Sequence, residues 1–368
     1  MTTSARLSKH ARVFATLRRE IEAGRWKGGE RLPSEADLTR RFGHSRITVG
    51  RALRDLQVAG LVERRAGSGT FVRRAQAGSV LSFGLLIPDL GESEIFEPIC
   101  QGMMASPMAR EHALVWGSGL SEAESKAERA LQLCRHYIER GVSGVFFAPL
   151  EYAQGKEEAN RRIVAALDEA RIPVVLLDRT VLPYPEPGQH DLVGIDNRRA
   201  GYVITEHLLR LGCRRVAFVA APNAISTVDA REAGYREALS KWNVPLEPAL
   251  VSRIDPQDVA KVETLLERRP DGIVSGNDRT AGRLMQSMRF LGYDIPNDVR
   301  LVGIDDVEYA RLLPVALTTL RQPTRQIGET ALAVMLDRVA RPHAPARHTL
   351  LHCELVVRES CGAKTAAS

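Results

Sequence analysis

The sequence predicts an α/β protein in which a small helical head with a β-hairpin precedes a larger, two-lobed body of parallel strands. Three observations support this fold class. Positive charge is concentrated near the N-terminus, short amphipathic helices and a glycine-rich hairpin fill residues 8–73, and apolar runs alternate with helical stretches beyond residue 80. With 368 residues, the chain can form two or three units with separate cores.

Charge is distributed unevenly along the chain. Residues 1–75 contain 17 Lys and Arg and 7 Asp and Glu, a net charge of +10, whereas residues 76–368 contain 34 and 38, a net charge of −4. Clustered basic residues gain affinity for polyanions by releasing condensed counterions, so this distribution indicates a nucleic-acid partner for the head. A membrane partner is disfavoured, because residues 8–58 lack a wide apolar stripe with Trp or Phe.

Targeting and metal-binding signals are absent from the sequence. No apolar run approaches the roughly 20 residues that span a bilayer, and the N-terminus lacks a signal-peptide core, so we expect a cytoplasmic protein. The five cysteines are scattered and predict neither disulfides nor a zinc site: Cys100, Cys134, Cys213, Cys353 and Cys361. His348, His352 and Cys353 lie in a stretch that reads as a strand, and we expect no metal or cofactor.

Helix signals open the head. Apolar residues at four-residue spacing in residues 11–21 indicate an amphipathic helix that ends at Gly24. Ser34 is a suitable N-cap for a second helix over residues 35–42, which Gly43 then ends. Two short helices joined by a tight turn containing glycine fit a helix-turn-helix.

The next helix has one apolar face and one polar face. Ser45 can cap it, and its buried stripe is predicted to be Val49, Ala52, Leu53 and Leu56. The outward face then comprises Arg46, Ile47, Gly50, Arg51 and Arg54. The first turn of a recognition helix usually reaches base edges in the major groove. A solvated charged face is the alternative for the arginines taken alone.

A basic hairpin follows the three helices. The stretches "LVERR" and "TFVRR" flank the glycine-containing turn "AGSG" and predict two strands with basic residues on both. Such a hairpin forms a wing. Helix, capped helix pair and wing in this order favour DNA binding over a solvated surface.

Residues 8–73 resemble the winged helix-turn-helix of the gluconate-repressor (GntR) regulators. The resemblance rests on "LPSE", "SRITV", "AL", "GLV" and "GSGTFV" at the family's spacing. It implies DNA contacts at Ser45, Arg46, Thr48, Gly67 and Gly69. At two positions where the family usually has arginine, this chain has Ala36 and Gly50. We therefore expect contacts to shift toward Arg46, Arg51, Arg54 and the wing residue Arg65, and the operator to differ from the family's common site.

The body alternates apolar runs with helical stretches. Continuous Val, Ile, Leu and Phe runs between helices indicate parallel strands covered on both faces, and about 280 residues suit two lobes. The expected strands lie in residues 80–88, 144–149, 174–178, 192–196, 215–221, 272–278 and 300–305.

Polar pairs follow three of these runs, where open parallel sheets bind ligands. The pairs are Asp178-Arg179, Asn277-Asp278 and Asp305-Asp306. Carboxylate and amide acceptors beside a forked guanidinium suit a small polyhydroxylated ligand. The alternatives are that Asp278 only caps a helix and that Asp306 only begins a turn. Taken jointly, the pairs favour a binding pocket.

From Leu81 to Ser360 the chain resembles the lac repressor and ribose-binding protein superfamily. "FGLLIPDL", "VVLLDR", "VGIDNRRAG" and "LTTLRQPTRQIGETA" are among the motifs that carry the resemblance, which implies a periplasmic-binding-protein-like fold. It implies effector contacts at Phe96, Asp178, Arg179, Arg231, Asn277, Asp305 and Gln322, to which we add Glu151 from "EYAQGK". Ile95, Ala148 and Ile195 replace residues that ribose binders use, which leaves the particular sugar open.

The two resemblances together are similar to the architecture of arabinose repressors. We expect a DNA-binding domain over residues 1–75, a linker over 76–80, and an effector and dimerisation domain over 81–361. The predicted function is a homodimeric transcriptional regulator, of the repressor type, whose affinity for double-stranded operator DNA is controlled by a monosaccharide. A purine or a sugar phosphate is an alternative effector.

An enzyme is the alternative from another class. It is disfavoured because the sequence lacks G-x-G-x-x-G after a strand, a P-loop, H-E-x-x-H and G-x-S-x-G. Asp178 and Asp305 could be proposed as a glycosidase pair. The arginine that follows Asp178 favours a permanently charged acceptor over a carboxylic acid with a raised pKa.

Overall fold

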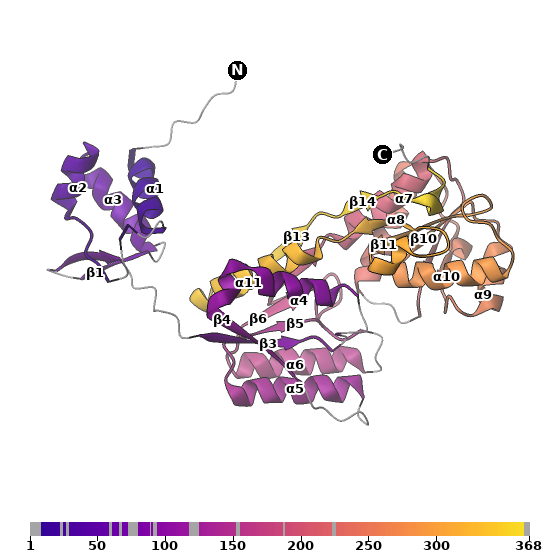
Figure 1. Ribbon diagram of the computed structural model, residues 1–368, viewed down its shortest axis with the longest axis horizontal. Coiled ribbons are helices and arrows are strands. Elements are labelled where there is room, and N and C mark those ends of the chain that lie inside the picture. Colours follow the sequence, from indigo (N-terminus) through magenta and orange to yellow (C-terminus); the bar gives the residue numbers. More distant parts are fainter. Residues whose placement is uncertain are drawn as a thin grey trace, which may run out of the picture. The chain divides into compact units, whose positions relative to one another are not determined.

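The chain divides into two compact units, residues 1–80 and 81–368 (Figure 1). The computed structural model describes residues 9–22, 25–26, 29–58, 61–65, 68–72, 80–88, 90, 94–117, 125–151, 155–186, 188–222 and 226–363. The predicted linker lies outside the described residues, apart from Val80. None of the helices in the described ranges is long and apolar enough to cross a membrane.

The head contains the predicted three helices and hairpin. Its elements are α1 (Lys9–Glu22), α2 (Glu35–Phe42), α3 (Arg46–Val58), β1 (Val62–Arg65) and β2 (Gly69–Val72). Ser34 caps α2 as expected: its hydroxyl accepts the Asp37 N–H, and the Asp37 carboxylate accepts the Ser34 N–H. The predicted stripe of α3 is wholly buried in the core of the head: Val49, Ala52, Leu53 and Leu56.

The hairpin is antiparallel, with Val62 opposite Val72 and Arg65 opposite Gly69. Gly69 has φ 112°, and a Cβ there would lie 2.8 Å from Nε of Arg31. Glycine is therefore required at this position by both backbone conformation and packing. The predicted contact residue Gly67 lies outside the described part of the chain.

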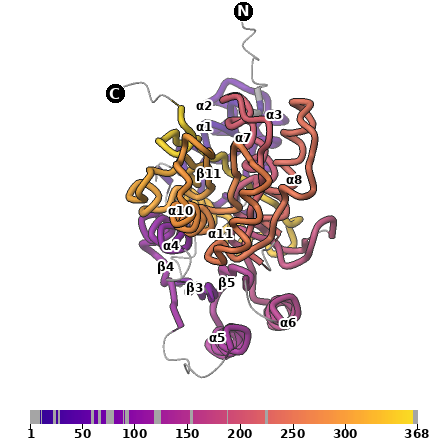
Figure 2. Tube along the Cα trace, turned by 90° about the vertical axis from the view of Figure 1, so that its right-hand side faces the viewer, coloured from indigo at the N-terminus to yellow at the C-terminus, as the bar shows by residue number. Residues whose placement is uncertain are grey.

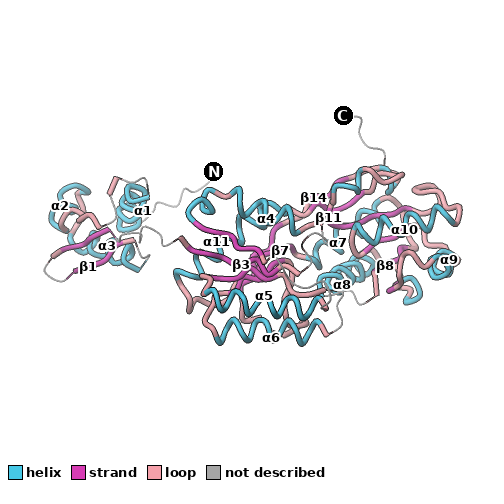
Figure 3. The backbone as a smooth tube through the Cα atoms, turned by 60° about the horizontal axis from the view of Figure 1, so that its bottom comes forward, coloured by secondary structure: helices cyan, strands magenta, loops and turns pink. Residues whose placement is uncertain are grey.

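The first lobe of the body is a six-stranded parallel sheet in the order β13-β7-β6-β5-β3-β4. Helices α5 and α6 cover one face, and α4 and α11 cover the other (Figures 1 and 3). Its strands are β3 (Leu81–Leu86), β4 (His112–Trp116), β5 (Gly144–Phe147), β6 (Val174–Leu177), β7 (Asp191–Ile195) and β13 (His348–Leu351). Its helices are α4 (Phe96–Ala105), α5 (Lys126–Arg140), α6 (Lys156–Glu169) and α11 (Thr324–Ala340).

The second lobe has the sheet order β14-β12-β11-β10-β8-β9, with only β14 antiparallel to its neighbour within the described residues. Helices α7 and α8 pack together (Figures 1 and 2), as do α9 and α10 (Figure 1). Its strands are β8 (Val216–Ala220), β9 (Val251–Arg253), β10 (Gly272–Ser275), β11 (Arg300–Asp305), β12 (Thr318–Arg321) and β14 (Glu354–Val356). Its helices are α7 (Asn197–Arg210), α8 (Ser226–Lys241), α9 (Val259–Leu266) and α10 (Asp278–Phe290).

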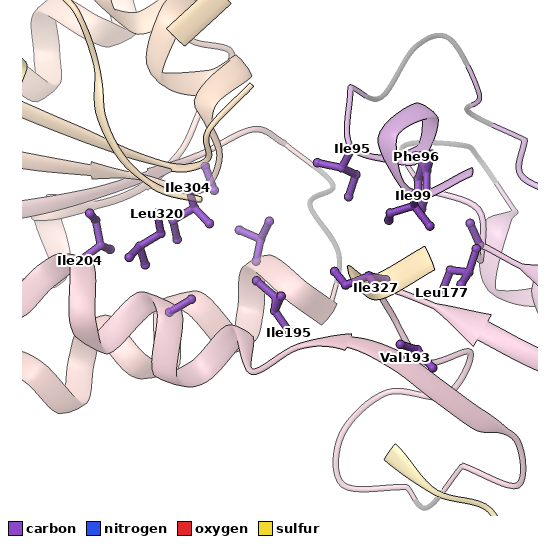
Figure 4. Close-up of a cluster of buried hydrophobic side chains, with 14 of the residues drawn as sticks. Ile95, Phe96, Ile99, Leu177, Val193, Ile195, Ile204, Ile304, Leu320 and Ile327 are labelled. Atoms are coloured by element: carbon purple, nitrogen blue, oxygen red, sulfur yellow. The ribbon is translucent and has the colours of Figure 1, made fainter. Parts of the chain in front are cut away.

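The chain passes between the lobes three times. The crossings follow β7, β12 and β13, at Asp196, at Gln322-Pro323 and at His352-Cys353. One apolar cluster continues from one lobe to the other, with Ile195 lying between the two groups of side chains (Figure 4). The crossings between the lobes are therefore packed by a continuous apolar cluster.

All seven predicted strands of the body are present, but one expectation about the C-terminal region is wrong. The run "HTLLHCELVV" forms two strands, β13 and β14, which belong to different sheets. His352 and Cys353 make the crossing between them. Strands β4, β9 and β12 were not among the predicted strands.

Candidate DNA interface and effector site

The outward face of α3 carries arginines that make no ion pair within the described residues. Arg46, Arg51 and Arg54 are exposed. Other arginines of the head are neutralised by carboxylates: Arg40 by Asp37, Arg41 by Glu20 and Arg64 by Glu35. The unpaired positive charge of α3 thus lies on the face opposite its buried stripe, where phosphates and base edges can be contacted.

Gly50 was predicted to face outward, but the structure does not leave it open to solvent. It is half-buried, and a Cβ there would lie 3.9 Å from Oε1 of Glu35 on α2. Glu35 is bound by Arg64 from the wing. The space beside Gly50 is therefore occupied by a carboxylate held in an ion pair, at ordinary van der Waals distance.

Ser45 and Thr48 interact with each other at the start of α3. Their hydroxyls are 3.0 Å apart, and the Thr48 N–H donates to the Ser45 hydroxyl at 3.4 Å. Ser45 therefore acts as a helix cap, and both hydroxyls remain at the end of α3 that carries Arg46. The side chain of the predicted contact Arg65 lies outside the described residues.

Four of the predicted effector residues form one cluster in the first lobe. The buried guanidinium of Arg179 donates to Asp178 at 3.1 Å and to Glu151 at 2.5 Å. It also lies over the ring of Phe96, 5.4 Å from the centroid. Phe96 is only 1% exposed, so it supports Arg179 and does not present its ring to a ligand.

The second lobe places Arg231 in a network of side chains. Its guanidinium donates to Oδ1 of Asn197 at 2.8 Å, to the carbonyl of Gly276 at 2.6 Å and to Oδ1 of Asp305 at 3.4 Å. The same Asp305 oxygen accepts Nε2–H of Gln322 at 2.7 Å. These bonds join α8, the end of β11 and the second lobe crossing. Asn197 was missed, although it lies two positions after the end of β7.

The structure shows a capping role for Asn277 and buries Asp278. The side chain of Asn277 caps α10 by accepting the Thr280 N–H at 2.8 Å. Asp278 is fully buried and accepts the Thr319 hydroxyl at 2.6 Å and the Val307 N–H at 3.2 Å. The alternative reading of Asp278 as a helix cap is therefore wrong. Asp278 fixes the loop that follows β11.

The backbone is strained at the strand ends that carry the site. Asp178 has φ 68°, Asp305 has φ 139° and Asp306 has φ 57°. Such conformations cost about 1–3 kcal/mol for residues other than glycine, and they persist where surrounding contacts enforce them. Asp306 also holds Arg321 at 2.7 Å and Arg358 at 2.5 Å, so its role exceeds that of a turn residue.

Burial raises the pKa of Asp305 to about 7, while the guanidinium of Arg231 opposes this shift. The negative charges of Asp278 and Asp178 add to the increase. Burial similarly raises the pKa of Asp278 to about 6. Asp178 lies at the end of β6 in the first lobe and Asp305 at the end of β11 in the second lobe.

A cleft of about 740 Å³ lies between the lobes beside Asp305 and Gln322. Within the described residues, two buried oxygens of the predicted site have no hydrogen-bond partner: Oδ1 of Asp178 and Oε1 of Gln322. Unpaired buried acceptors are costly unless a ligand supplies donors. Residues of the cleft that sequence reasoning missed are mostly acidic or polar: Glu94, Glu97, Gln101, Glu308 and Tyr309.

Comparison with known proteins matches both units. Residues 9–72 match the gntR family of bacterial regulatory proteins, and residues 205–361 match the periplasmic binding protein-like domain. The arabinose metabolism transcriptional repressor of Geobacillus stearothermophilus is 27% identical, over 96% of this chain and 98% of its own. The ribose operon repressor of Halalkalibacterium halodurans is 24% identical, over 98% and 97%.

Solved structures give the same result. A complex of the transcriptional regulator CelR with cellobiose has a TM-score of 0.64 and 26% identity, and the match covers 86% of this chain and 91% of that one. The protein is therefore an effector-controlled transcriptional regulator of the repressor type. It joins a GntR-type winged helix-turn-helix to an effector body with the fold of the lac repressor and periplasmic binding proteins.

Proposed function

We propose that the effector of this regulator is an uncharged monosaccharide, bound between the two lobes of the body. The observation that carries the proposal is the pair of unpartnered buried acceptors: Oδ1 of Asp178, in the first lobe, and Oε1 of Gln322, at the second crossing between the lobes. Sugar hydroxyls supply the donors that these oxygens lack. Ligand binding by groups from both lobes favours the closed arrangement and thereby changes operator affinity.

The charge of the site supports a neutral effector over a sugar phosphate. Arg179 already pairs with Asp178 and Glu151, and Arg231 contacts Asp305. The cleft adds further carboxylates that an anion would have to approach: Glu94, Glu97, Asp306 and Glu308. A phosphate group would therefore enter a negatively charged region in which Arg179 and Arg231 are already paired with carboxylates.

The site also gives little support for a purine effector. Flat bases are commonly held against exposed aromatic faces. The predicted aromatic, Phe96, is buried beneath Arg179. The sugar repressors among the relatives and the cellobiose-bound structure agree with the neutral-sugar proposal.

A thermal-shift screen of the full chain tests the proposal. Neutral pentoses and hexoses are compared with their phosphates and with purines, and any hit is added to an operator titration. A ligand at 100 times its Kd is expected to stabilise the protein by about 2.7 kcal/mol. Stabilisation by purines or phosphates alone would contradict the proposal. Chemical conversion of a bound sugar would show that the body is an enzyme, whereas the relatives reported above are transcriptional regulators.

We further propose that the regulator acts in the cytoplasm as a homodimer formed through the body, on a two-fold operator. Large apolar side chains are exposed on both lobes and suit such an interface: Met104, Met108, Phe290 and Leu312. Light scattering of the full chain is expected to give twice the monomer mass. A monomeric mass at micromolar concentration, with binding to single half-sites, would contradict this proposal.

A further inference from the structure

Ile47 is exposed on the DNA-facing side of α3. Its side chain is 81% exposed, in the first turn of the helix. Among the described residues of the head, it is the large apolar side chain with the highest solvent exposure. The buried stripe of α3 lies on the other side of the helix, so the core of the head does not account for an isoleucine here.

The surroundings of Ile47 are cationic. Arg46 precedes it, and Arg51 lies one helical turn further along the same face. Neither arginine makes an ion pair within the described residues, as shown above. The positive charges of Arg46 and Arg51, which attract phosphates, thus lie on both sides of the compact apolar side chain of Ile47. Because isoleucine is branched at Cβ, its side chain is confined largely to one rotamer in a helix, so its direction is fixed.

We infer that Ile47 reads a thymine in the operator by packing against the C5-methyl group of that base. The thymine methyl is the apolar feature of the major-groove edge, and apolar side chains recognise it. Contact between the Ile47 side chain and the thymine methyl removes apolar surface of both groups from water. Adenine, guanine and cytosine have no methyl group at this edge and cannot make the same contact. The inference rests on the DNA-binding function and adds a base-specific contact to it.

Deoxyuridine scanning tests this contact, because uracil differs from thymine in the major groove only by the missing methyl. An operator is first selected from random duplexes with the full-length protein. Each thymine is then replaced in turn, and Kd is measured. We expect one thymine in each half-site at which the replacement weakens binding about fourfold, as loss of one buried methyl group predicts.

The Ile47→Ala variant supplies the second arm of the experiment. It is expected to bind the thymine and uracil duplexes equally at that position, because the contact is already lost. Arg51→Ala is the matched control: it should bind more weakly overall and retain the fourfold preference for thymine. Since Ile47 is exposed, the alanine variant is expected to keep its melting temperature.

Two results would overturn the inference. One is an operator at which no deoxyuridine replacement changes the affinity of the unmodified protein. The other is an Ile47→Ala variant that still prefers thymine at the sensitive position. Failure of the selection to enrich any duplex is a different result, because it would remove the DNA-binding function on which the inference rests.

Discussion

Arg231 and Asp305 are joined at 3.4 Å, and the Asp305 oxygen that Arg231 contacts also accepts Nε2–H of Gln322. Gln322 lies at one of the three crossings between the lobes. An effector that bonds to Asp305 or Gln322, as proposed above, would therefore act directly on one of the segments that connect the lobes.

Arg231→Ala is expected to abolish the effector-induced thermal shift. It would also leave Asp305 without its cation; because the pKa of Asp305 is already about 7, the carboxyl is expected to bind a proton, so the loss of stability should stay below the about 3–5 kcal/mol of pairs that remain charged. The free energy of unfolding is measured by urea titration without effector. Arg198→Ala is the control, because Arg198 makes an exposed pair with Glu237 between helices α7 and α8. A normal ligand shift in Arg231→Ala would remove this residue from the site.

The Asp178→Ala variant distinguishes an effect on effector binding from an effect on folding better than Arg231→Ala does. Oδ1 of Asp178 has no partner within the described residues, so the substitution removes the bond of Oδ2 to Arg179 and adds modest strain at a φ of 68°. We expect the effector response to be lost while the unliganded variant binds the operator nearly as well as the parent protein. Electrophoretic mobility shift with and without sugar measures both. Loss of operator binding as well would indicate a role in folding.

The raised pKa of Asp305 predicts that the unliganded protein is more stable below neutrality. The folded state holds this proton up to about pH 7, whereas the unfolded chain loses it near 3.8. The contribution to stability is therefore fully present below about pH 4 and is lost as pH rises to about 7. Asp305→Asn should flatten the decrease in melting temperature over this range. An unchanged slope would contradict the assignment.

Sugar binding should show the opposite dependence on pH. A hydroxyl that donates to Asp305 favours its carboxylate form, so binding releases a proton near neutrality. We expect affinity to decrease several-fold as the pH falls from 8 to 6. Calorimetry in buffers with different ionisation enthalpies measures the proton released. Proton uptake would show that Asp305 instead binds the sugar as a neutral acid.

The glycine in the recognition helix is not required by packing. A methyl group at Gly50 would meet Glu35 at an ordinary 3.9 Å, so Gly50→Ala is expected to stabilise the protein by up to about 1 kcal/mol. Gly69→Ala is the contrast, since its positive φ and the nearby Arg31 make a side chain unfavourable. Urea unfolding monitored in the head measures both. Destabilisation by Gly50→Ala would show that the helix is constrained more closely than this geometry indicates.

Gly50→Arg tests the same position for DNA recognition. A guanidinium there can pair with Glu35 and displace Arg64 of the wing, so the selected operator is expected to change. The comparison is a selection from random duplexes with each protein. Identical operators would mean that position 50 does not contribute to base preference.

Arg46→Ala should weaken binding to the selected operator by about 1–3 kcal/mol if Arg46 makes a bidentate base contact. Arg40→Ala provides a comparison, since Arg40 is paired with Asp37 on α2. Fluorescence anisotropy on the operator and on a scrambled duplex distinguishes base reading from phosphate contact. Equal weakening on both duplexes would assign Arg46 to the phosphates.

Local signals were sufficient to predict much of the fold. Ser34 and Gly43 delimit α2 because capping depends on neighbouring residues. Asp178-Arg179 and Asp305-Asp306 lie at the carboxyl ends of β6 and β11, as the pattern of apolar runs predicted. In contrast, the break at His352-Cys353 depends on which sheet each half joins, and an apolar run does not encode that choice.

The roles of single site residues were harder to predict, because they depend on distant partners. Phe96 is covered by Arg179, which lies 83 positions later in the sequence. Gly50 is approached by Glu35 from another helix. Asp278 is held by Thr319 through a bond that closes only when the second sheet is assembled.

The weaving of the chain between the lobes has a consequence for biosynthesis. Helix α11, which packs on β5, β6 and β7, and strand β13, which completes the first sheet, are both encoded near the C-terminal end. A nascent chain that has emerged from the ribosome only as far as β12 therefore presents an unfinished first lobe with an uncovered apolar face. Neither lobe is complete until β13 and β14 have been made, and a premature stop after Gln322 is expected to yield an aggregating product in place of a smaller repressor.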